Sequence, residues 1–492
     1  LLTFYFFFTQ NLKKYGNSHM RKHLKNILLL SIVIISFIMH YKHFSKDIIS
    51  IHSWRQTQTQ TTINNFYEED MNILNPRRNE RGNGDGIFRM EFPLMQWLVA
   101  SSYHLFGNSI LVTRLFMFGI GILSVLGTYQ LLLSLFRKEM LATIGAWAFN
   151  FSPSFFYYTI NPLPDNLALC CAIWGLVLFF KWTESKKHTP LILCGILLSI
   201  GALCKLPFIL YFIVPAVYLL RSIIKSQQYK KHILQGLLVF TSLLFPLLWY
   251  ITAIPKWKGN GIVSGMLDNS TSFSTLVDYL THNLISTLPE LLLNYGSVLF
   301  FIAGFYFLFT KKAFRNSHFL LIIALSFSAL AYFVFEINMI AKIHDYYLFP
   351  FYPLLFMLVG YGAFHIYTTG KKSFKIITIS LLCALPITCY IRMYERWIPE
   401  SPGFNRDLLE HKSELREIVP DDALVIIGND VSRYISFYYI DKKGLGFDND
   451  NLTSDKLKTM IDNGAEFLYS DSRKVDSSNL ITPHLDELYE DS

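Results

Sequence analysis

Long apolar runs recur through most of this chain and constrain its fold more than any other feature. Each run extends over roughly 18–22 residues, which is the length that an α-helix needs to cross the hydrocarbon core of a bilayer. Only 16% of the residues are charged, whereas soluble domains carry about 25%. The chain is therefore predicted to be an all-α polytopic membrane protein over most of its length.

We predict about eleven membrane spans, with a cytoplasmic N-terminus. This orientation makes every inner connection basic, as the positive-inside rule requires. Because the number of spans is odd, the segment after the last span is expected on the outer side. The predicted spans are 27–44, 110–136, 139–158, 165–182, 189–204, 206–221, 232–253, 290–310, 317–336, 346–368 and 374–392.

The apolar region is bounded by two segments of different character. Met20 opens a basic stretch before the first apolar run, a pattern typical of a signal-anchor. We therefore expect residues 1–19 to be a non-native or disordered extension. Residues 20–395 form the predicted transmembrane domain, with outer loops at 45–109 and 255–289.

After Trp397 the hydropathy falls, and acidic residues outnumber basic ones. The alternation of strand-like and helix-like patterns predicts a small soluble α/β domain over residues 396–492, placed outside the membrane. Its expected strands are 423–428 and 465–469, and its expected helices are 431–440 and 453–462.

Polar residues are placed at the outer ends of the predicted spans rather than in their middles. Transporters and proton pumps commonly hold ionisable groups near the membrane midplane. The distribution here instead favours a reaction site at the outer surface, built by loops over a helical scaffold. The residues concerned are His52, Arg55, Glu91, Asp165, Lys205, Glu336, His344 and Asp345.

Each of these residues also has a structural interpretation. Asp165 begins an apolar helix, so it is either an N-cap or a site residue. Lys205 is either a membrane anchor or a phosphate contact. The segment His344–Tyr347 is either part of an aromatic belt or part of a site, and the same choice applies to Trp54 and its neighbours.

Short motifs at these positions resemble a known family when they are taken in order. They are His-x-Trp-Arg-Gln at 52–56, Glu-Phe-Pro-Leu at 91–94, Pro-Asp at 164–165, Lys-x-Pro at 205–207 and His-Asp-Tyr-Tyr at 344–347. The set resembles the bacterial relatives of protein O-mannosyltransferases and aminoarabinose transferases, in the glycosyltransferase family 39 group with the C-type membrane fold. The resemblance extends over roughly residues 27–390.

The resemblance implies an enzyme that transfers a hexosyl or pentosyl group from a polyprenyl-phosphate-linked donor on the outer face of the membrane. Members of the family carry an acidic residue where this chain has His52, followed by an Arg that corresponds to Arg55. Their Lys-Pro-Pro motif corresponds here to Glu91-Phe92-Pro93. We interpret the two departures as an exchange of acid and base across the loop, because a His oriented by a carboxylate is a good base near neutral pH.

The predicted site assigns each residue a role. Asp165 matches a second acidic position of the family and is the first candidate for the catalytic base. The predicted catalytic residues are Asp165, His52 and Glu91, and the predicted substrate-binding residues are Arg55, Trp54, Gln56, Lys205, His344, Asp345, Tyr346 and Tyr347.

The expected partners are the polyprenyl-phosphate sugar, membrane lipids and an acceptor that is a protein, a lipid or a glycan. A nucleic-acid partner is not expected, because the basic residues lie at helix ends. A divalent metal ion is left open, since no ligand spacing indicates one. The alternative functions are a lipid-linked glycan translocase and a non-catalytic envelope-assembly subunit. The expected location is the inner or plasma membrane.

Overall fold

The computed structural model describes residues 18–81, 84–225, 228–257, 265, 271–311, 317–428, 430, 432–447, 452–470, 479 and 481. Apart from its last two residues, the predicted extension 1–19 lies outside this described part. The chain forms two compact units. The helical unit comprises Leu1–Ser45, Met90–Phe92 and Thr113–Tyr394, and the sheet unit comprises Lys46–Arg89, Pro93–Val112 and Glu395–Ser492.

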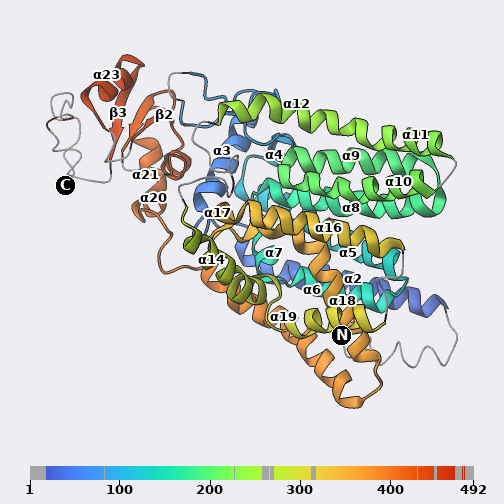
Figure 1. Ribbon diagram of the computed structural model, residues 1–492. Helices are drawn as coiled ribbons and strands as arrows, with labels where there is room; N and C mark the ends of the chain where they lie inside the picture. Colours follow the sequence, from blue (N-terminus) through green and yellow to red (C-terminus); the bar gives the residue numbers. More distant parts are fainter. Residues whose placement is uncertain are drawn as a thin grey trace. The chain divides into compact units, whose positions relative to one another are not determined.

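The helical unit is built from long helices joined by short turns (Figure 1). Helix α8 runs alongside α9, and α15 runs alongside α18. Its α-helices are α2 (Ser18–His40), α5 (Ile110–Phe136), α6 (Glu139–Asn150), α7 (Pro153–Tyr158), α8 (Pro164–Ser185), α9 (His188–Cys204), α10 (Ile213–Lys225), α11 (Tyr229–Phe240), α12 (Leu244–Ala253), α14 (Phe273–His282), α15 (Val298–Thr310), α16 (Ser317–Phe335), α17 (Ile337–Ile340), α18 (Tyr352–Thr368) and α19 (Lys372–Trp397). Tighter or wider helical turns are η1 (Tyr41–His43), η2 (Leu206–Phe212), η3 (Thr241–Leu243), η4 (Ile254–Lys256), η6 (Asn283–Leu292) and η8 (Asp345–Phe351).

Within the described part of the chain, six helices are long and apolar enough to cross a membrane. They are Ile110–Phe136, Pro164–Ser185, Leu206–Lys225, Tyr229–Lys256, Asp345–Thr368 and Lys372–Trp397. Four shorter apolar helices, Leu29–His43, His188–Cys204, Val298–Thr310 and Leu320–Phe335, coincide with further predicted spans. The chain is thus a multi-pass membrane protein, and the count of eleven spans stays a prediction.

The predicted span 139–158 is not a continuous helix. It consists of α6, with 12 residues, and α7, with 6 residues. Pro153 lies at the start of α7, and the residue before it, Ser152, is extended. Proline has no N–H to donate and disfavours helical geometry in the preceding residue. The first helix therefore ends before Pro153, and a second helix begins there.

The predicted outer loop 255–289 also differs in the structure, because much of its described part is helical. Helix α14 is followed directly by η6, a π-helix that contains Pro289. Ser272 caps α14 by accepting a hydrogen bond from the backbone N–H of Thr275 at 3.2 Å. The Ser/Thr/Asn-rich composition that indicated a loop therefore partly reflects helix capping.

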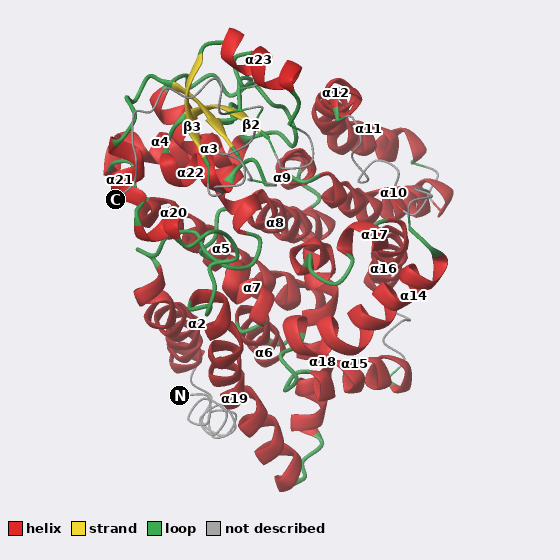
Figure 2. Ribbon diagram, turned by 90° about the vertical axis from the view of Figure 1, so that its left-hand side faces the viewer, coloured by secondary structure: helices red, strands yellow, loops and turns green. Residues whose placement is uncertain are grey.

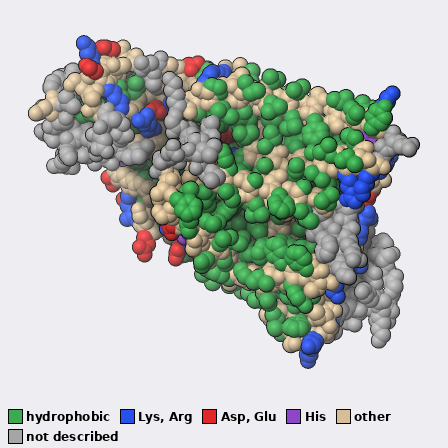
Figure 3. Space-filling model, in the orientation of Figure 1, with side chains coloured by type: hydrophobic (Ala, Val, Ile, Leu, Met, Phe, Trp, Pro, Cys, Tyr) green, Lys and Arg blue, Asp and Glu red, His purple; other side chains and the backbone are tan. Residues whose placement is uncertain are grey.

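Hydrophobic side chains cover much of the visible surface of the helical region (Figure 3). Ile251 of α12, Phe309 of α15 and Phe327 of α16 are each at least two-thirds exposed. Monomeric soluble proteins rarely expose large contiguous apolar surfaces. These side chains therefore indicate a surface that faces lipid.

Glycines allow α15 and α18 to approach closely. A Cβ atom added at Gly362 would lie 1.9 Å from the carbonyl oxygen of Phe300, and one added at Gly304 would lie 2.3 Å from that of Leu358. Small residues at helix interfaces let the two backbones come into contact, which strengthens packing where hydrophobic burial supplies little.

The sheet unit contains a three-stranded parallel sheet of order β2-β1-β3 (Figure 2). Ile426 of β1 packs with Leu457 and Met460 of α23, whereas Val425 and Ile427 pack with residues of α22. Alternate residues of β1 thus point to opposite faces, each covered by a helix. The elements of this unit are α3 (Ser53–Glu68), α4 (Leu94–Phe106), α20 (Asp407–Glu410), α21 (Lys412–Glu417), β1 (Leu424–Ile427), α22 (Ile435–Ile440), β2 (Lys443–Gly446), α23 (Ser454–Asp462) and β3 (Ala465–Tyr469).

Strand β2 was not predicted from the sequence, because two of its four residues are glycines. Gly444 is required by a close approach, since an added Cβ would lie 1.8 Å from the carbonyl oxygen of Val425. The outer edge of β2 also pairs with the first loop. Gly444 donates to the carbonyl of Asn79 at 3.0 Å and accepts from the N–H of Arg81 at 2.7 Å. The loop and the C-terminal segment are therefore hydrogen-bonded into one unit.

Helix α3 lies within the predicted outer loop 45–109 and is buried on most of its surface. Several of its polar side chains are hydrogen-bonded inside the unit, whereas Gln60 Oε1 and Thr61 Oγ1 have no partner among the described residues. The Gln60 amide donates to the hydroxyl of Tyr103 at 2.7 Å, and the Asn65 amide donates to the Asn79 side chain at 3.0 Å. Burial of polar groups is tolerated when they are hydrogen-bonded in this way.

The close contact of α15 and α18 yields the first prediction. We expect Gly362→Leu to lower the thermal stability of the detergent-solubilised protein, because overpacking a well-packed interface costs about 1–3 kcal/mol. Gly119→Leu is the matched control, since a Cβ added at this α5 glycine meets nothing within 4 Å. The measurement is the monodisperse fraction after heating, by size-exclusion chromatography. Equal melting temperatures for the two variants would contradict the prediction.

Candidate active site

Asp165 lies in the first turn of α8 and is 1% exposed. The N-cap of this helix is Leu163, and no side chain caps it. The N-cap interpretation of Asp165 is therefore wrong, although its carboxylate still lies at the positive end of the helix dipole. Its Oδ1 is 3.4 Å from the Nζ of Lys205, and its buried Oδ2 has no hydrogen-bond partner among the residues that the structure describes.

Lys205 lies in the turn between α9 and η2, where its backbone is extended. The Nζ atom also lies over two aromatic rings, 4.6 Å from the ring centre of Tyr347 and 5.5 Å from that of Tyr346. An ammonium over an aromatic face is attracted by the ring quadrupole. Lys205 is thus held between a carboxylate and two tyrosines, and three of the predicted substrate-binding residues come together.

The segment that contains these tyrosines is also bonded to α7. The hydroxyl of Tyr158 donates to Oδ1 of the buried Asp345 at 2.8 Å. The Nδ1 of His344 lies 2.6 Å from the carbonyl oxygen of Met339. Burial lowers the pKa of His344 below its usual value, although the hydrogen bond to Met339 opposes the shift. His344 and Asp345 therefore shape this segment through specific contacts, which an exposed aromatic belt would not need.

Glu336 is a residue of this region to which sequence analysis gave no role. It follows α16 and is 7% exposed, and its buried Oε2 has no hydrogen-bond partner within the described part of the chain. Burial raises the pKa of Glu336 to about 7, with the charge of Lys205 acting in the opposite direction. A carboxyl group with this pKa can exchange a proton near neutral pH. The signal in the sequence was its place at the outer end of a span.

Glu91 belongs to the helical unit through the short segment Met90–Phe92. The N–H of Phe92 donates to the carbonyl of Leu203 at 3.0 Å, and the indole of Trp249 donates to the carbonyl of Met90 at 2.9 Å. Leu203 is two residues before Lys205. The structure therefore places the buried Glu91 on a segment bonded to the turn that carries Lys205.

The remaining predicted site residues lie in the sheet unit, at the start of α3. His52 precedes the helix with a left-handed backbone conformation, φ 55°, and its side chain is buried. The buried Arg55 guanidinium donates to the side chain of Gln58, and the Gln56 amide donates to the carbonyl of Ile51 at 3.0 Å. Trp54 remains 37% exposed. The proposed exchange of acid and base between His52 and Glu91 stays a prediction.

The described residues do not fit a divalent cation. Among them, no group of three or more His, Cys, Asp or Glu side chains is placed to hold a metal ion. In addition, the carboxylate of Asp165 already faces the ammonium of Lys205. We derive no chemical step through a metal.

Comparison with known proteins agrees with this architecture. Residues 91–250 match the family model of dolichyl-phosphate-mannose-protein mannosyltransferases. The structure of ArnT from Cupriavidus metallidurans bound to undecaprenyl phosphate is similar, with a TM-score of 0.60 and 12% identity over 92% of this chain and 90% of that chain. The oligosaccharyltransferase AglB from Archaeoglobus fulgidus, in complex with an inhibitory peptide and a dolichol-phosphate, has a TM-score of 0.60 and 11% identity over 92% of this chain and 70% of that chain.

The chain has the C-type membrane glycosyltransferase fold. The predicted resemblance to glycosyltransferase family 39 is confirmed over residues 91–250, and this matched part includes Glu91, Asp165 and Lys205. The arabinofuranosyltransferase AftD from Mycobacteria is also similar, with a TM-score of 0.52 and 12% identity over 87% of this chain and 33% of that chain. No curated protein matches the sequence significantly.

The buried Glu336 gives a pH-dependent prediction for this protein. Its pKa is raised from 4.5 to about 7 in the folded state, so folding favours the protonated form. The stability that the protonated Glu336 contributes is therefore fully present below pH 4.5 and is lost as the pH rises through about 7. We expect Glu336→Gln to remove this loss, so that the variant gains stability relative to the wild type at pH 8 but not at pH 5.

The measurement for this prediction is the melting temperature of the two proteins across pH 4–9. Glu139→Gln, which changes an exposed glutamate in α6, is the control. A difference between wild type and Glu336→Gln that is independent of pH would show that Glu336 does not ionise in this range.

Proposed function

We propose that the protein transfers a sugar from a polyprenyl-phosphate-linked donor to an acceptor at the outer face of the membrane. The observation that carries the proposal is the pair of Lys205 and Asp165, with Nζ and Oδ1 3.4 Å apart. Together with Glu336 it combines one cation with two buried carboxylate oxygens that have no partner among the described residues. The cation suits a phosphate group, and the carboxylate oxygens suit a hydroxyl group that donates a hydrogen bond.

Lys205 is proposed to bind the donor phosphate. A lysine ammonium has three donors and acts as a compact point charge, and the surrounding rings of Tyr346 and Tyr347 limit its positions. The structures of ArnT with undecaprenyl phosphate and of AglB with a dolichol-phosphate, which share this fold, support a lipid phosphate as the ligand.

Asp165 is proposed as the general base. Its Oδ1 faces Lys205, while its free Oδ2 accepts the hydrogen bond of the acceptor hydroxyl. In the transfer step the base takes the hydroxyl proton, and the acceptor oxygen forms a bond to the anomeric carbon of the sugar. The bond between that carbon and the phosphate oxygen breaks, and the polyprenyl phosphate leaves with the electron pair. Lys205 stabilises the negative charge that develops on the leaving group.

Glu336 and Glu91 are proposed to support this reaction. Because the pKa of Glu336 is about 7, this residue can receive the proton from Asp165 and release it to solvent. The segment that carries Glu91 is proposed to position the turn of Lys205 through the backbone hydrogen bond between Phe92 and Leu203, and Glu91 itself stays a predicted catalytic residue. His344 and Asp345 hold the tyrosines that border the phosphate site, and Asp345 does so through Tyr158.

The remaining features of the proposal come from the sequence. The donor carries a hexosyl or pentosyl group, and the acceptor is a protein, a lipid or a glycan. The membrane is the inner or plasma membrane, and the segment 396–492 is outside it. Three further residues, Trp54, Arg55 and Gln56, belong to the sheet unit. They stay predicted substrate contacts.

A reconstituted transfer assay tests the proposed site. We expect Asp165→Asn to lower the transfer rate by at least about 100-fold, which is the usual contribution of a general base. We expect Lys205→Ala to lower the rate and also to weaken binding of undecaprenyl phosphate, because it removes the phosphate contact. The assay offers a panel of polyprenyl-phosphate sugars and candidate acceptors in proteoliposomes.

A second ion pair in the helical unit provides matched controls. Asp278 and Lys342 are 2.6 Å apart and largely exposed, so Asp278→Asn and Lys342→Ala make the same chemical changes outside the proposed site. Both controls should transfer at the wild-type rate. Wild-type rates for Asp165→Asn and Lys205→Ala as well would show that the reaction, if present, occurs elsewhere.

A further inference from the structure

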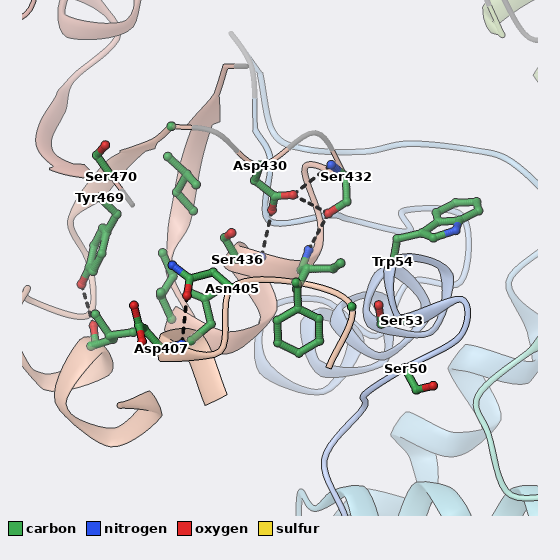
Figure 4. A pocket seen from close by; sticks show the side chains of 18 of the residues that line it. Ser50, Ser53, Trp54, Asn405, Asp407, Asp430, Ser432, Ser436, Tyr469 and Ser470 are labelled. Atoms are coloured by element: carbon green, nitrogen blue, oxygen red, sulfur yellow. Dashed lines mark hydrogen bonds between the residues drawn. The ribbon is translucent and has the colours of Figure 1, made fainter. Parts of the chain in front are cut away.

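The sheet unit contains a cavity of about 760 Å³ that the proposed transfer site does not include (Figure 4). It lies at the carboxyl ends of β1 and β3, where Ile427 and Gly428 of one strand meet Tyr469 and Ser470 of the other. Its volume falls in the range of about 300–1,000 Å³ that is usual for small-molecule sites. The remaining wall comes from the start of α3 and from the segment around α20.

The position of the cavity follows from the order of the strands. The chain leaves the central strand β1 toward β2 on one side, and after β2 it crosses to β3 on the other side. The connection after β1 therefore leads away from β3, and the cavity is a crevice at the carboxyl ends of these two strands. Ligands of open parallel sheets bind in such crevices.

The charges around the cavity disfavour a phosphate. Two carboxylates, those of Asp407 and Asp430, line it, whereas no Lys or Arg is among the described residues of its wall. The carboxylate of Asp430 is occupied locally, since it accepts hydrogen bonds from the N–H groups of Ser432 and Ser436, each at 2.9 Å. Asp407 remains an exposed acceptor. An anionic lipid headgroup would meet repulsion here rather than a cation.

The neutral polar groups of the wall suit a ligand with many hydroxyls. Ser50, Ser53 and Ser436 line the cavity, and their hydroxyls make no hydrogen bond with other described residues. Asn405 adds an amide and Asp407 a carboxylate, so that the wall offers both donors and acceptors.

Aromatic rings complete the chemistry of the wall. Trp54, which is 37% exposed, lines the cavity together with Phe404 and Tyr469. A sugar ring presents an apolar C–H face that stacks on an aromatic ring, while its hydroxyls extend sideways to polar groups. Rings with an apolar body next to polar partners are suited to this mixed contact.

We propose that this cavity binds a neutral saccharide. The inference rests on the proposed transfer reaction in one respect only, namely that the bound saccharide is part of the acceptor. His52 also lines the cavity, so in this proposal it contacts the acceptor glycan, and its place in the reaction is recognition rather than proton transfer. Trp54 contributes the stacking surface.

Direct binding measurements on the full-length protein in nanodiscs test the proposal. The probes are neutral disaccharides of glucose, galactose, mannose and N-acetylglucosamine, observed by saturation-transfer NMR, with inorganic phosphate as competitor. We expect at least one disaccharide to bind and phosphate not to displace it. Trp54→Ala removes the stacking ring, and Ser436→Phe fills the cavity. Each should weaken binding by about tenfold or more.

Phe106→Ala is the matched control, because Phe106 is 73% exposed in the same unit and lies outside the cavity wall. It should bind the disaccharide as the wild type does. The proposal is overturned if no disaccharide binds, if binding survives both cavity variants, or if phosphate displaces the sugar.

Lys205→Ala separates this proposal from the proposed function. This variant should lose transfer yet keep wild-type saccharide affinity. Saccharide binding in a protein that transfers no sugar from any donor would overturn the transfer reaction and retain the cavity. Sugar transfer by a protein that binds no saccharide would overturn the proposal for the cavity and retain the proposed transfer reaction.

Discussion

The buried contact between Asp165 and Lys205 is the interaction on which the candidate active site depends. Removing two charges from water costs several kcal/mol per ion, so each needs a partner inside the protein. The first turn of α8 supplies the carboxylate, and the extended turn after α9 supplies the ammonium. The packing of α8 against α9 brings the two together. The tyrosines of η8 then surround the ammonium.

The carboxylate oxygens left without partners explain why this arrangement is better suited to function than to stability. A buried oxygen that makes no hydrogen bond costs roughly 1–3 kcal/mol, and both Asp165 and Glu336 carry one among the described residues. Most buried polar groups of folded proteins are hydrogen-bonded, as the side-chain amides of Gln60 and Asn65 in α3 are. A substrate hydroxyl would relieve this deficit by donating a hydrogen bond, while the ammonium of Lys205 suits the donor phosphate. This is the physical basis of the proposed reaction.

The two units place their polar residues in different chemical surroundings. In the helical unit a lysine lies next to carboxylates, which suits a phosphate and a proton transfer. In the sheet unit the cavity has hydroxyls, an amide and aromatic rings without a described lysine or arginine, which suits a neutral sugar. The donor and the acceptor of a glycosyl transfer differ in the same way. His52 and Trp54, which the sequence predicted as catalytic and substrate-binding residues, line this cavity in the sheet unit.

Apolar length was sufficient to predict a multi-pass membrane protein, because a lipid-crossing helix must be long and uniformly apolar. The structure brings Asp165, Lys205 and Tyr347 together, and the position of the site at the outer ends of the spans stays a prediction. The break at Pro153 and strand β2 were missed, since both depend on local backbone geometry that hydropathy does not report.

Only the tertiary structure decided the roles that depend on contacts between distant segments. Glu336 has an Oε2 atom without a hydrogen-bond partner among the described residues and a pKa of about 7, and both result from burial. The sequence does not predict this burial, because a residue at the end of an apolar run can equally be exposed. The exclusion of Asp165 as an N-cap required the backbone of Leu163. The cavity beside Trp54 is lined by residues more than 350 positions apart in the chain, such as Ser53 and Ser436. Sequence patterns determine which segments are helical and apolar, whereas the pairing of segments across the fold determines which polar groups meet.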